Sequence, residues 1–426
     1  MFESKKVRAI GMTLLAGALL AACGGVDSGS GSGGSTGSDG AAADGSVPGV
    51  TADTITLGHM TDLSGPFAPI GKEYLTGAQL FVSNKNAAGG VCGRKIELDI
   101  QDHGYNAQKA ATLYTESSPK VLGYEAIIGS PMATAVLPSV EKDNIVMSPL
   151  TFEVSLLQTD AAVFEPGPTY EVSAANATAW AIEQNKLQPG DKIGMIVFEG
   201  AFGDNAEHGV DIAATNAGVE VVKTRIKPAD TDFTGPVTTM RSEGAKIVVL
   251  GTGASQMSAI LSTASSLGYD PQQWLQPNTG SFNAGLLDGP AAQTLLDKVV
   301  FASPGAVWSE TDIPAVKELH TAYEAQKPDV APGAGVVIGY AQAQAYTEII
   351  SKSCDNLTRA GLVEQFRATT ALDTGGLLLP LDFTRGDGQK SPTLATNIVK
   401  PDKAAEGGLV LVEENYTSEA VKGSDL

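Results

Sequence analysis

The chain has 426 residues, of which 42% are hydrophobic, and carries a formal net charge of −20 at pH 7. A chain of this length is large for a single hydrophobic core, so we expect two lobes. The strong negative charge argues against nucleic acid or an anionic membrane surface as the main partner.

The first residues predict export from the cytoplasm. Lys5, Lys6 and Arg8 precede an uncharged apolar run over residues 10–22. This run is too short for a permanent membrane helix and is typical of a signal-peptide core. It ends with Leu-Ala-Ala before Cys23, which resembles the bacterial lipobox, in which the cysteine is diacylated. We expect a signal peptide over residues 1–22 and a lipid anchor at Cys23. An ordinary secretory signal with an unrelated cysteine is the alternative.

Residues 24–40 consist almost entirely of Gly, Ser, Thr and Asp. Such a segment cannot bury a core and behaves as a flexible coil. We therefore expect residues 23–51 to tether a folded body, beginning near Ala52, to the outer side of the cell membrane. The predicted location is extracytoplasmic.

The first part of the body alternates strands with helices. Strands are predicted near residues 55–57 and over 96–100, 126–128 and 145–147, with helices over 71–86, from about 106 and over 131–142. Gly89 and Gly90 end the first of these helices. The alternation predicts a parallel sheet with right-handed crossovers.

A second series of the same kind follows. Strands are predicted over 192–198, 219–222, 246–250 and 299–302, helices over 205–217, 255–267, 336–354 and 359–369, and a strand-rich tail from 377. Pro166 and Pro168 fall between the two series, where we expect the chain to cross between lobes. The predicted fold is α/β, with two doubly wound parallel-sheet lobes joined by a multi-crossing hinge. Lobe one is assigned residues 52–166 and 303–378, lobe two 167–302 and 379–416, and a tail 417–426.

Two cysteines remain in the body, Cys92 and Cys354. In an oxidising compartment an even pair most often forms a disulfide, and two buried free thiols are the alternative. Two cysteines and four scattered histidines show no metal-ligand spacing, so we expect neither a metal nor a cofactor.

Three groups of short motifs together resemble the branched-chain amino-acid-binding group of type I periplasmic binding proteins. They are Leu-Ser-Gly-Pro at residues 63–66 followed by Gly71, the glycine-rich stretch at 88–96, and Ile-Gly-Ser at 128–130 with Ser-Pro at 148–149. The resemblance extends from Thr54 to about Glu414. It implies a monomeric receptor, not an enzyme, that binds a small solute between its lobes and passes it to the permease subunits of an ABC transporter.

In such sheets ligands bind beyond the carboxyl ends of the strands. The candidate ligand-binding residues are Ser64, Phe67, Met132, Ala133, Thr134, Leu150, Thr151, Phe152, Phe202, Gly253 and Asn278. The resemblance implies that Thr134 and Thr151 hold a ligand carboxylate and that Phe202 packs on the ligand. Thr134 could instead only cap a helix, and Phe202 could belong to the core.

Asn278 stands where the amino-acid-binding members of the family place an acidic residue that meets the ligand ammonium. A tyrosine that the resemblance predicts near Gly253 is absent. A neutral amide balances a desolvated ammonium group poorly. The ligand class therefore stays open among a branched-chain amino acid, an amide, a carboxylate or another small polar solute.

Two functions other than a transport receptor are considered for this sequence, a sensor and a hydrolase. A sensor lipoprotein coupled to a membrane signalling protein would use the same fold. An exported hydrolase would need a group such as Asp102, His103 or Glu199, but adjacent residues after a strand face opposite sides, so Asp102 and His103 cannot act as a pair. Known hydrolase, phosphate-loop and dinucleotide motifs are absent from the sequence. Tyr105 and Tyr340 are interpreted as packing residues.

Overall fold

The computed structural model describes residues 46–426, which belong to one compact unit. The expected signal peptide, Cys23 and most of the expected tether lie outside the described residues. Val47 and Val50 already pack against a hydrophobic core, ahead of the expected start of the body at Ala52. Within residues 46–426, no helix is long and apolar enough to cross a membrane.

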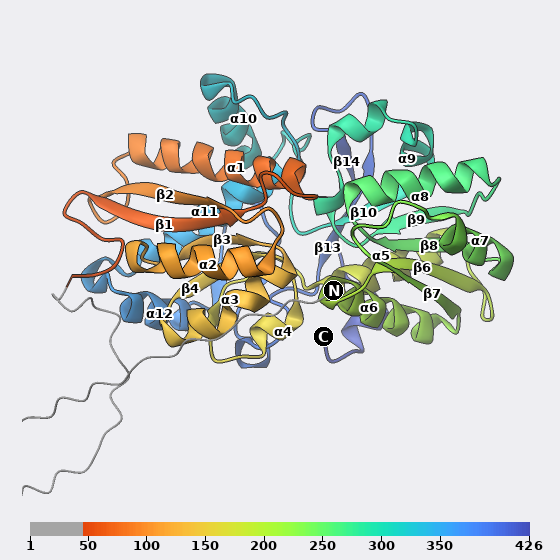
Figure 1. The fold of residues 1–426 in the computed structure, drawn as a ribbon, viewed down its shortest axis with the longest axis horizontal. Coiled ribbons are helices and arrows are strands. Elements are labelled where there is room, and N and C mark those ends of the chain that lie inside the picture. The colour runs from red at the N-terminus through yellow and green to blue at the C-terminus, as the bar shows by residue number, and fades with distance from the viewer. Residues whose placement is uncertain (1–45) are drawn as a thin grey trace, which may run out of the picture. The chain divides into compact units, whose positions relative to one another are not determined.

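The first sheet has five parallel strands in the order β2-β1-β3-β4-β5 (Figure 1). The strands are β1 (Thr54–Thr61), β2 (Lys95–Asp102), β3 (Tyr124–Ile128), β4 (Val146–Leu150) and β5 (Ala162–Val163). Its helices are α1 (Ala68–Ala87), α2 (Ala107–Ser117), α3 (Ser130–Lys142), α10 (Pro314–Gln326), α11 (Ala334–Ser351) and α12 (Arg359–Ala368). Leu57 joins a core with α1 and α11, whereas Met60 joins a core with α2 and α3. Because successive strand residues face opposite sides, helices cover both faces of this sheet. We call this part lobe one.

The second sheet has seven strands in the order β14-β13-β10-β9-β8-β6-β7. The strands are β6 (Lys192–Phe198), β7 (Glu220–Ile226), β8 (Ile247–Gly251), β9 (Gln273–Gln276), β10 (Val299–Ser303), β13 (Thr396–Pro401) and β14 (Leu409–Tyr416). Strands β6 to β10 are parallel, but β13 and β14 add to the edge in antiparallel pairing. The two doubly wound lobes are thus as predicted, with antiparallel edge strands contributed by the tail.

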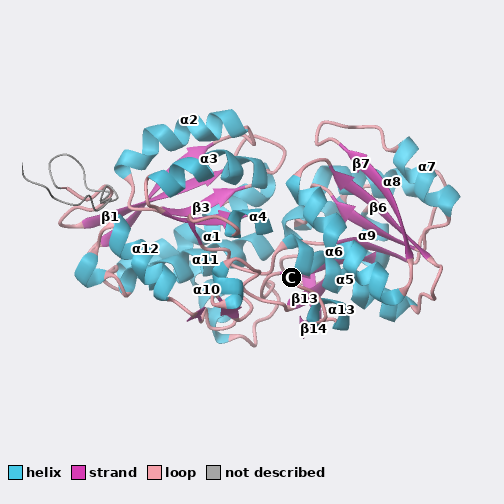
Figure 2. Ribbon diagram, turned by 90° about the horizontal axis from the view of Figure 1, so that it is seen from below, coloured by secondary structure: helices cyan, strands magenta, loops and turns pink. Residues whose placement is uncertain are grey.

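Helices also cover both faces of the second sheet, as Figure 2 shows for each lobe. They are α5 (Tyr170–Asn185), α6 (Ala201–Ala217), α7 (Thr234–Glu243), α8 (Ala254–Ser266), α9 (Ala292–Lys298) and the short α13 (Glu419–Lys422). Met195 faces a core with α5 and α6, and Ile196 a core with α7 to α9. Val421 of α13 packs on α5. We call this part lobe two.

The chain passes between the lobes after β5, after β10 and after the small ribbon β11 (Ala371–Leu372) and β12 (Leu381–Asp382). Leu381 still belongs to the core of lobe one, so the third passage follows it. The first passage, residues 164–169, is buried throughout. Three passages, the first of them buried throughout, make the link between the lobes a packed hinge rather than a free linker.

Three of the longer helices, α5, α7 and α10, were not expected from the sequence, nor were the short helices α4 (Val154–Leu157), α9 and α13. In α5 every residue from Glu171 to Ile182 is buried. A helix buried on all sides has no polar face, so it lacks the alternation by which an amphipathic helix is recognised. Helix α7 is short and mostly polar, and only Val237 and Met240 of its residues are buried. Two apolar residues are too few to make the helix recognisable from its sequence pattern.

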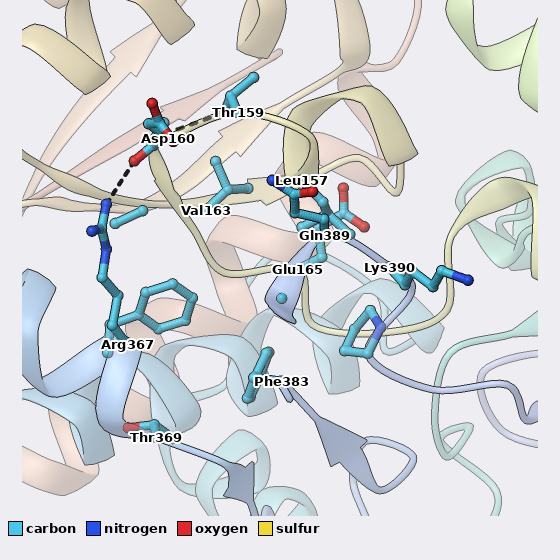
Figure 3. Close-up of a pocket in the computed structure, with 15 residues that line it drawn as sticks. Leu157, Thr159, Asp160, Val163, Glu165, Arg367, Thr369, Phe383, Gln389 and Lys390 are labelled. Carbon is cyan, nitrogen blue, oxygen red and sulfur yellow. Dashed lines mark hydrogen bonds between the residues drawn. The ribbon is translucent and has the colours of Figure 1, made fainter. Parts of the chain in front are cut away.

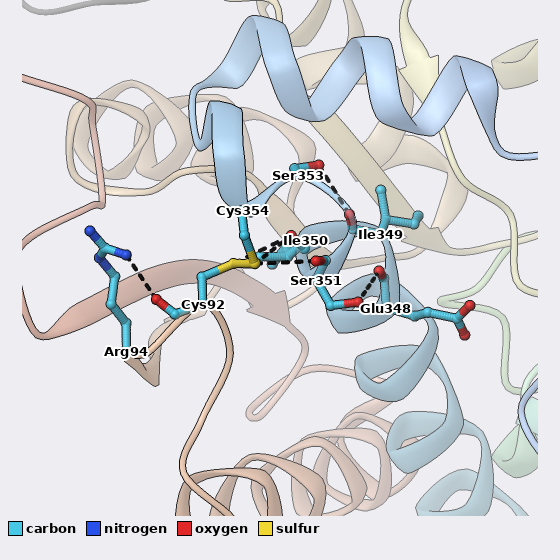
Figure 4. Close-up of a disulfide and its surroundings, with 8 residues drawn as sticks. All are labelled: Cys92, Arg94, Glu348, Ile349, Ile350, Ser351, Ser353 and Cys354. Carbon is cyan, nitrogen blue, oxygen red and sulfur yellow. Dashed lines mark hydrogen bonds between the residues drawn. A yellow bond between two sulfur atoms is a disulfide. The ribbon is translucent and has the colours of Figure 1, made fainter.

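The cysteine pair of the body forms a disulfide, as expected (Figure 4). Cys92 lies in the turn between α1 and β2, and Cys354 lies just beyond α11. Their Cα atoms are 5.2 Å apart although they are separated by 262 residues in sequence. Both belong to lobe one, so the bond ties an early and a late segment of the chain into the same lobe.

We predict that loss of this bond lowers the free energy of unfolding by about 2–4 kcal/mol, because a crosslink restricts the unfolded chain. Denaturant titration of the Cys92→Ser and Cys354→Ser double variant measures the effect. Reduction of the wild-type protein under denaturing conditions should also raise its intact mass by two hydrogens. An unchanged mass and midpoint would mean that the bond does not form.

Glu73 of α1 is a buried carboxyl group at the start of α11. Its Oε2 atom accepts a hydrogen bond from the Gly335 N–H at 3.1 Å. A Cβ atom at Gly335 would lie 2.8 Å from the same oxygen, so the close approach requires glycine. Burial raises the pKa of Glu73 to about 8, and the Gly335 hydrogen bond lowers it only in part. Glu73 is therefore mostly protonated in the folded protein at neutral pH.

This pKa predicts a loss of stability with rising pH. Between about pH 4.5 and about pH 8 the folded chain holds a proton on Glu73 that the unfolded chain has released, so the free energy of unfolding falls by up to about 1.4 kcal/mol per pH unit. Unfolding titrations across this range should show a shallower decline for Glu73→Gln. Glu116→Gln, an exposed change on α2, serves as the control and should keep the wild-type slope. Equal slopes in all three proteins would contradict the assignment.

Candidate functional site

An apolar pocket lies where the strand-end loops of the two lobes meet. It is lined by Phe67, Ile70, Tyr74, Tyr105, Ile128, Gly129, Ser130, Leu150, Phe152, Tyr170, Phe202, Asn278, Thr279, Gly280, Ser281, Pro304 and Ile338. Its free volume is about 60 Å³. Loops after β1, β3 and β4 form one wall, and α5, α6 and the turn after β9 form the other. This is the position that the sequence predicts for a ligand site.

Aromatic rings from both lobes dominate the pocket. The rings of Phe67 and Tyr105 in lobe one lie 4.5 Å apart between centroids. Tyr170 and Phe202 in lobe two lie 4.6 Å apart. Phe152 of lobe one meets Tyr170 of lobe two edge-on at 5.8 Å, so the two aromatic groups touch across the boundary between lobes.

Two carboxylates shape the loop that carries Phe67. Asp62 accepts hydrogen bonds from the backbone N–H groups of Gly65 at 2.5 Å and Phe67 at 2.8 Å. Asp102 accepts from the Leu63 N–H at 2.9 Å and from the Ser64 hydroxyl at 2.7 Å. Burial raises the pKa of Asp102, but these two hydrogen bonds, a third from the Gly104 N–H and the charge of Lys109 together outweigh burial and lower the pKa overall. Asp102 therefore works as an ionised anchor for the loop.

Tyr105 reaches the pocket from a left-handed backbone conformation, with φ of +57°. Such a conformation is uncommon and unfavourable for a residue with a side chain, and is often found at functional sites. A Cβ atom on neighbouring Gly129 would lie 2.8 Å from the Tyr105 ring. Glycine at 129 thus leaves room for the ring beside the start of α3.

A chain of hydroxyl groups runs beside the pocket. The Ser130 and Thr151 hydroxyl oxygens are 2.5 Å apart, and Thr151 donates to the Tyr170 hydroxyl at 3.3 Å. Burial raises the pKa of Tyr170 to about 12, so its hydroxyl stays neutral. These groups can donate or accept hydrogen bonds and carry no charge.

Asn278 lines lobe two's side of the pocket, directly before the 3₁₀ turn η2 (Thr279–Ser281). A Cβ atom at Gly280 would lie 2.9 Å from the Asn278 Oδ1 atom and 3.4 Å from the Tyr74 hydroxyl of lobe one. The lobes therefore approach closely at this turn. None of the described residues that line the pocket carries a formal charge.

The structure brings about half of the predicted ligand-binding residues to the pocket. Phe67, Leu150, Phe152, Phe202 and Asn278 line it. Thr151 does not line the pocket but is hydrogen-bonded to Ser130, which does. A Cβ atom at Gly253 would lie 3.4 Å from the Phe67 ring, so Gly253 flanks the pocket from lobe two.

Four of the predicted residues do not line this pocket. Met132 and Ala133 are fully buried in the core of lobe one. Thr134 is exposed on α3, and the exposed Ser64 turns its hydroxyl to Asp102. Helix α3 begins at Ser130, and each further residue turns by about 100° around the helix axis. Only the first residue of α3 therefore faces the pocket.

Several lining residues were missed. Ile70 follows Phe67 by three residues and Tyr74 follows Ile70 by four, so one face of α1 lines the pocket and this spacing is a signal for it. Tyr105, interpreted as a packing residue, lines the pocket, whereas Tyr340 packs against Phe81 in the core. Tyr170 lies on the helix that sequence reasoning did not find.

A second hollow, of about 340 Å³, lies between the segment from helix α4 (Val154–Leu157) to β5, the end of α12 and the stretch 383–392 (Figure 3). The Arg367 guanidinium donates to the Asp160 carbonyl oxygen at its rim, at 2.7 Å. The residues described as lining it include none of the predicted ligand-binding set. It lies away from the strand ends of lobe two, so we do not assign the ligand to it.

The residues weighed for hydrolysis are not assembled for it. Burial lowers the pKa of His103 to about 4, and its Nδ1 atom accepts a hydrogen bond from the Tyr105 N–H at 3.0 Å. Neither Asp102, His103 nor Glu199 is among the residues described as lining the pocket. Among residues 46–426 there is also no group of three or more His, Cys, Asp or Glu side chains suited to a metal ion.

Comparison with solved structures identifies the fold. The chain is 36% identical to the fatty acid ABC transporter substrate-binding protein from Thermomonospora curvata, with a TM-score of 0.84, covering 90% of this chain and 98% of that one. It also resembles a branched-chain amino acid ABC transporter protein from Thermus thermophilus with bound valine, at 17% identity and a TM-score of 0.74, over 88% and 99% of the two chains. The second likeness concerns the fold alone.

Sequence relatives point the same way. The Leu/Ile/Val-binding protein homolog 8 of Brucella abortus is 26% identical over 257 residues, or 55% of this chain and 62% of that protein. The match therefore spans less than two thirds of that relative's length. The Leu/Ile/Val-binding protein of Escherichia coli is 25% identical over 71% of this chain and 81% of its own length.

The family model described as periplasmic binding protein matches residues 54–405, which is most of the described chain. Proteins of this family carry solutes and are not enzymes. The two-lobed α/β fold, the pocket between the lobes and this match agree, and the chain belongs to the periplasmic binding protein family, in the type I group of the Leu/Ile/Val-binding proteins.

Proposed function

We propose that this chain is the substrate-binding protein of an ABC importer, held outside the cytoplasm by a lipid on Cys23. It would capture its ligand in the interlobe pocket and deliver it to the permease subunits. Family membership and the lipobox-like start of the chain support this proposal. The division into lobes near residues 166 and 302 and a monomeric state belong to the same proposal, with the third division placed after Leu381 instead of near residue 378.

For the ligand we infer an amphiphilic carboxylate, such as a fatty acid. The observation that carries this inference is the lining of the pocket, which is aromatic and aliphatic and has no charged side chain among the described residues. An α-amino acid would leave its ammonium group without an anionic partner, which is costly in a desolvated site. The Thermomonospora curvata relative is named as a fatty acid-binding protein, which supports the same class.

The polar groups of the pocket suit one end of such a ligand. The hydroxyls of Ser130 and Tyr170 and the amide of Asn278 can donate hydrogen bonds to carboxylate oxygens. Ser130 also opens α3, where the helix dipole favours negative charge. The aliphatic part would lie against Phe67, Phe202 and their neighbours.

Admission of any ligand requires the lobes to part. A free volume of about 60 Å³ is well below the roughly 300–1,000 Å³ of common ligand sites. Contacts such as Phe152 with Tyr170 close the pocket and must separate on opening. The packed passages between the lobes provide a hinge for this movement.

The first test is a ligand screen by thermal shift. A medium-chain carboxylate such as decanoate should raise the melting temperature as its concentration rises, because it binds only the folded protein. Leucine, isoleucine and valine should give a smaller shift, and decanamide reports on the need for the charge. A strong shift with leucine and none with decanoate would refute the inferred ligand class.

Asn278→Asp tests the position of the carboxylate. The new negative charge would repel a bound carboxylate in a low-dielectric pocket, so we expect decanoate affinity to fall at least about tenfold. Isothermal titration calorimetry measures the change. Asn283→Asp adds the same charge nearby but outside the pocket lining and should bind as the wild type does. An equal loss in both variants would argue against contact at residue 278.

A further inference from the structure

Glu153 is a buried carboxyl group beside the pocket. Its side chain is 4% exposed. It follows Phe152, which lines the pocket, and precedes Val154, whose N–H donates to the Asn205 Oδ1 atom of lobe two at 3.2 Å. Glu153 therefore lies where the two lobes touch.

The carboxyl group of Glu153 is only half satisfied. Its Oε1 atom accepts a hydrogen bond from the Ser155 hydroxyl. Its Oε2 atom is buried without a hydrogen bond of ordinary geometry, although the nearby Ser130 hydroxyl interacts with the carboxyl group. An ionised carboxylate in this position would be poorly compensated, whereas a neutral carboxyl group costs much less.

The charges around Glu153 also disfavour its ionised form. Asp204 on α6 of lobe two raises the pKa of Glu153. Glu165, buried in the first passage between the lobes, interacts with Glu153, and burial raises the pKa of Glu165 well above its ordinary value. Both oxygens of Glu165 lack a hydrogen-bond partner, and Glu171 of α5 adds a further negative charge to this region. Carboxyl groups from α6, from the first passage and from α5 thus gather in this part of the cleft.

The nearby cations are engaged elsewhere. Arg225 forms an ion pair with Asp204 at 2.6 Å, and His208 pairs with Glu171 at 2.7 Å between His208 Nδ1 and Glu171 Oε1. Burial raises the pKa of Glu153, the Ser155 and Ser130 hydroxyls lower it in part, and Asp204 raises it further. Geometry and charge agree that the closed lobes favour a protonated Glu153.

We propose that Glu153 is a proton-binding site of the cleft, which takes up a proton from solvent when the lobes close around a ligand and releases it when they open. Opening would break the contact of Val154 with Asn205 and move Asp204 away from Glu153. Water would then reach the carboxyl group and favour its ionised form. The inference rests on the proposed function, since it concerns the same cleft.

Proton uptake on closure determines how the ligand affinity changes with pH. Because the closed form binds a proton that the open form has lost, affinity for the ligand falls as pH rises above the open-state pKa. For one proton the fall is at most about tenfold per pH unit, and it ends at the closed-state pKa. Binding must also consume a proton in this window.

Isothermal titration calorimetry with decanoate, in buffers of different ionisation enthalpy from about pH 5 to about pH 8, measures the proton directly. Wild-type protein should take up close to one proton at the lower end of the range. Glu153→Gln, which mimics the neutral form, should take up none and keep its affinity across the range. His208→Asn should behave as the wild type, because His208 pairs with Glu171.

Uptake that persists in Glu153→Gln would assign the proton to another group or to the probe and overturn the inference. Asp204→Asn provides a second variant, which should shift the fall in affinity to lower pH by removing a like charge. Binding without proton uptake in the wild type would also overturn it, while leaving the proposed function intact.

Small-angle X-ray scattering of the ligand-free protein separates this inference from the ligand class. The radius of gyration of the wild type should decrease as pH falls, because protonation favours closure, and that of Glu153→Gln should not change with pH. If decanoate does not bind but this difference is seen, the ligand class is wrong and the proton site stands. Identical pH profiles in both proteins would overturn the proton site.

Discussion

The covering of both sheet faces by helices is the constraint on which the rest of this structure depends. Leu57 and Met60 in lobe one, and Met195 and Ile196 in lobe two, face opposite helix layers. With both faces used for cores, the ends of the strands are what remains for binding. A pocket made from the strand-end loops of two such sheets needs the lobes side by side. The three passages of the chain between lobes hold them in that arrangement.

Much of the fold could be predicted because its strands are short apolar runs at regular spacing. The prediction failed where a helix has no polar face, as in α5, or where the apolar stripe is weak, as in α7. The antiparallel pairing of β13 and β14 is a long-range property of the tail. The local sequence of these strands does not indicate whether they pair parallel or antiparallel with their neighbours.

The site was harder to predict than the fold. The position of a loop after a strand indicates that the loop lies near the pocket, and Phe152 and Asn278 of two such loops do line it. Which residues of the loop face inward depends on where the next helix begins, and for α3 this excluded Met132 and Thr134. The aromatic character of the pocket emerged only when Tyr105 and Tyr170, distant in sequence, came together with Phe67 and Phe202.

The disulfide has a consequence for the order in which the chain can be assembled. Cys354 is synthesised after all of the parallel strands of lobe two but before β13 and β14, which complete the second sheet. When the exported chain emerges N-terminus first into an oxidising compartment, lobe one can therefore be covalently closed while lobe two still lacks its edge strands. Domains tend to fold as units in the order in which they emerge. At that stage the edge strand β10 of the second sheet would be unpaired, because β13 has not yet added to it. An unpaired strand edge can pair with other chains, so this edge would need protection until β13 and β14 have folded onto it.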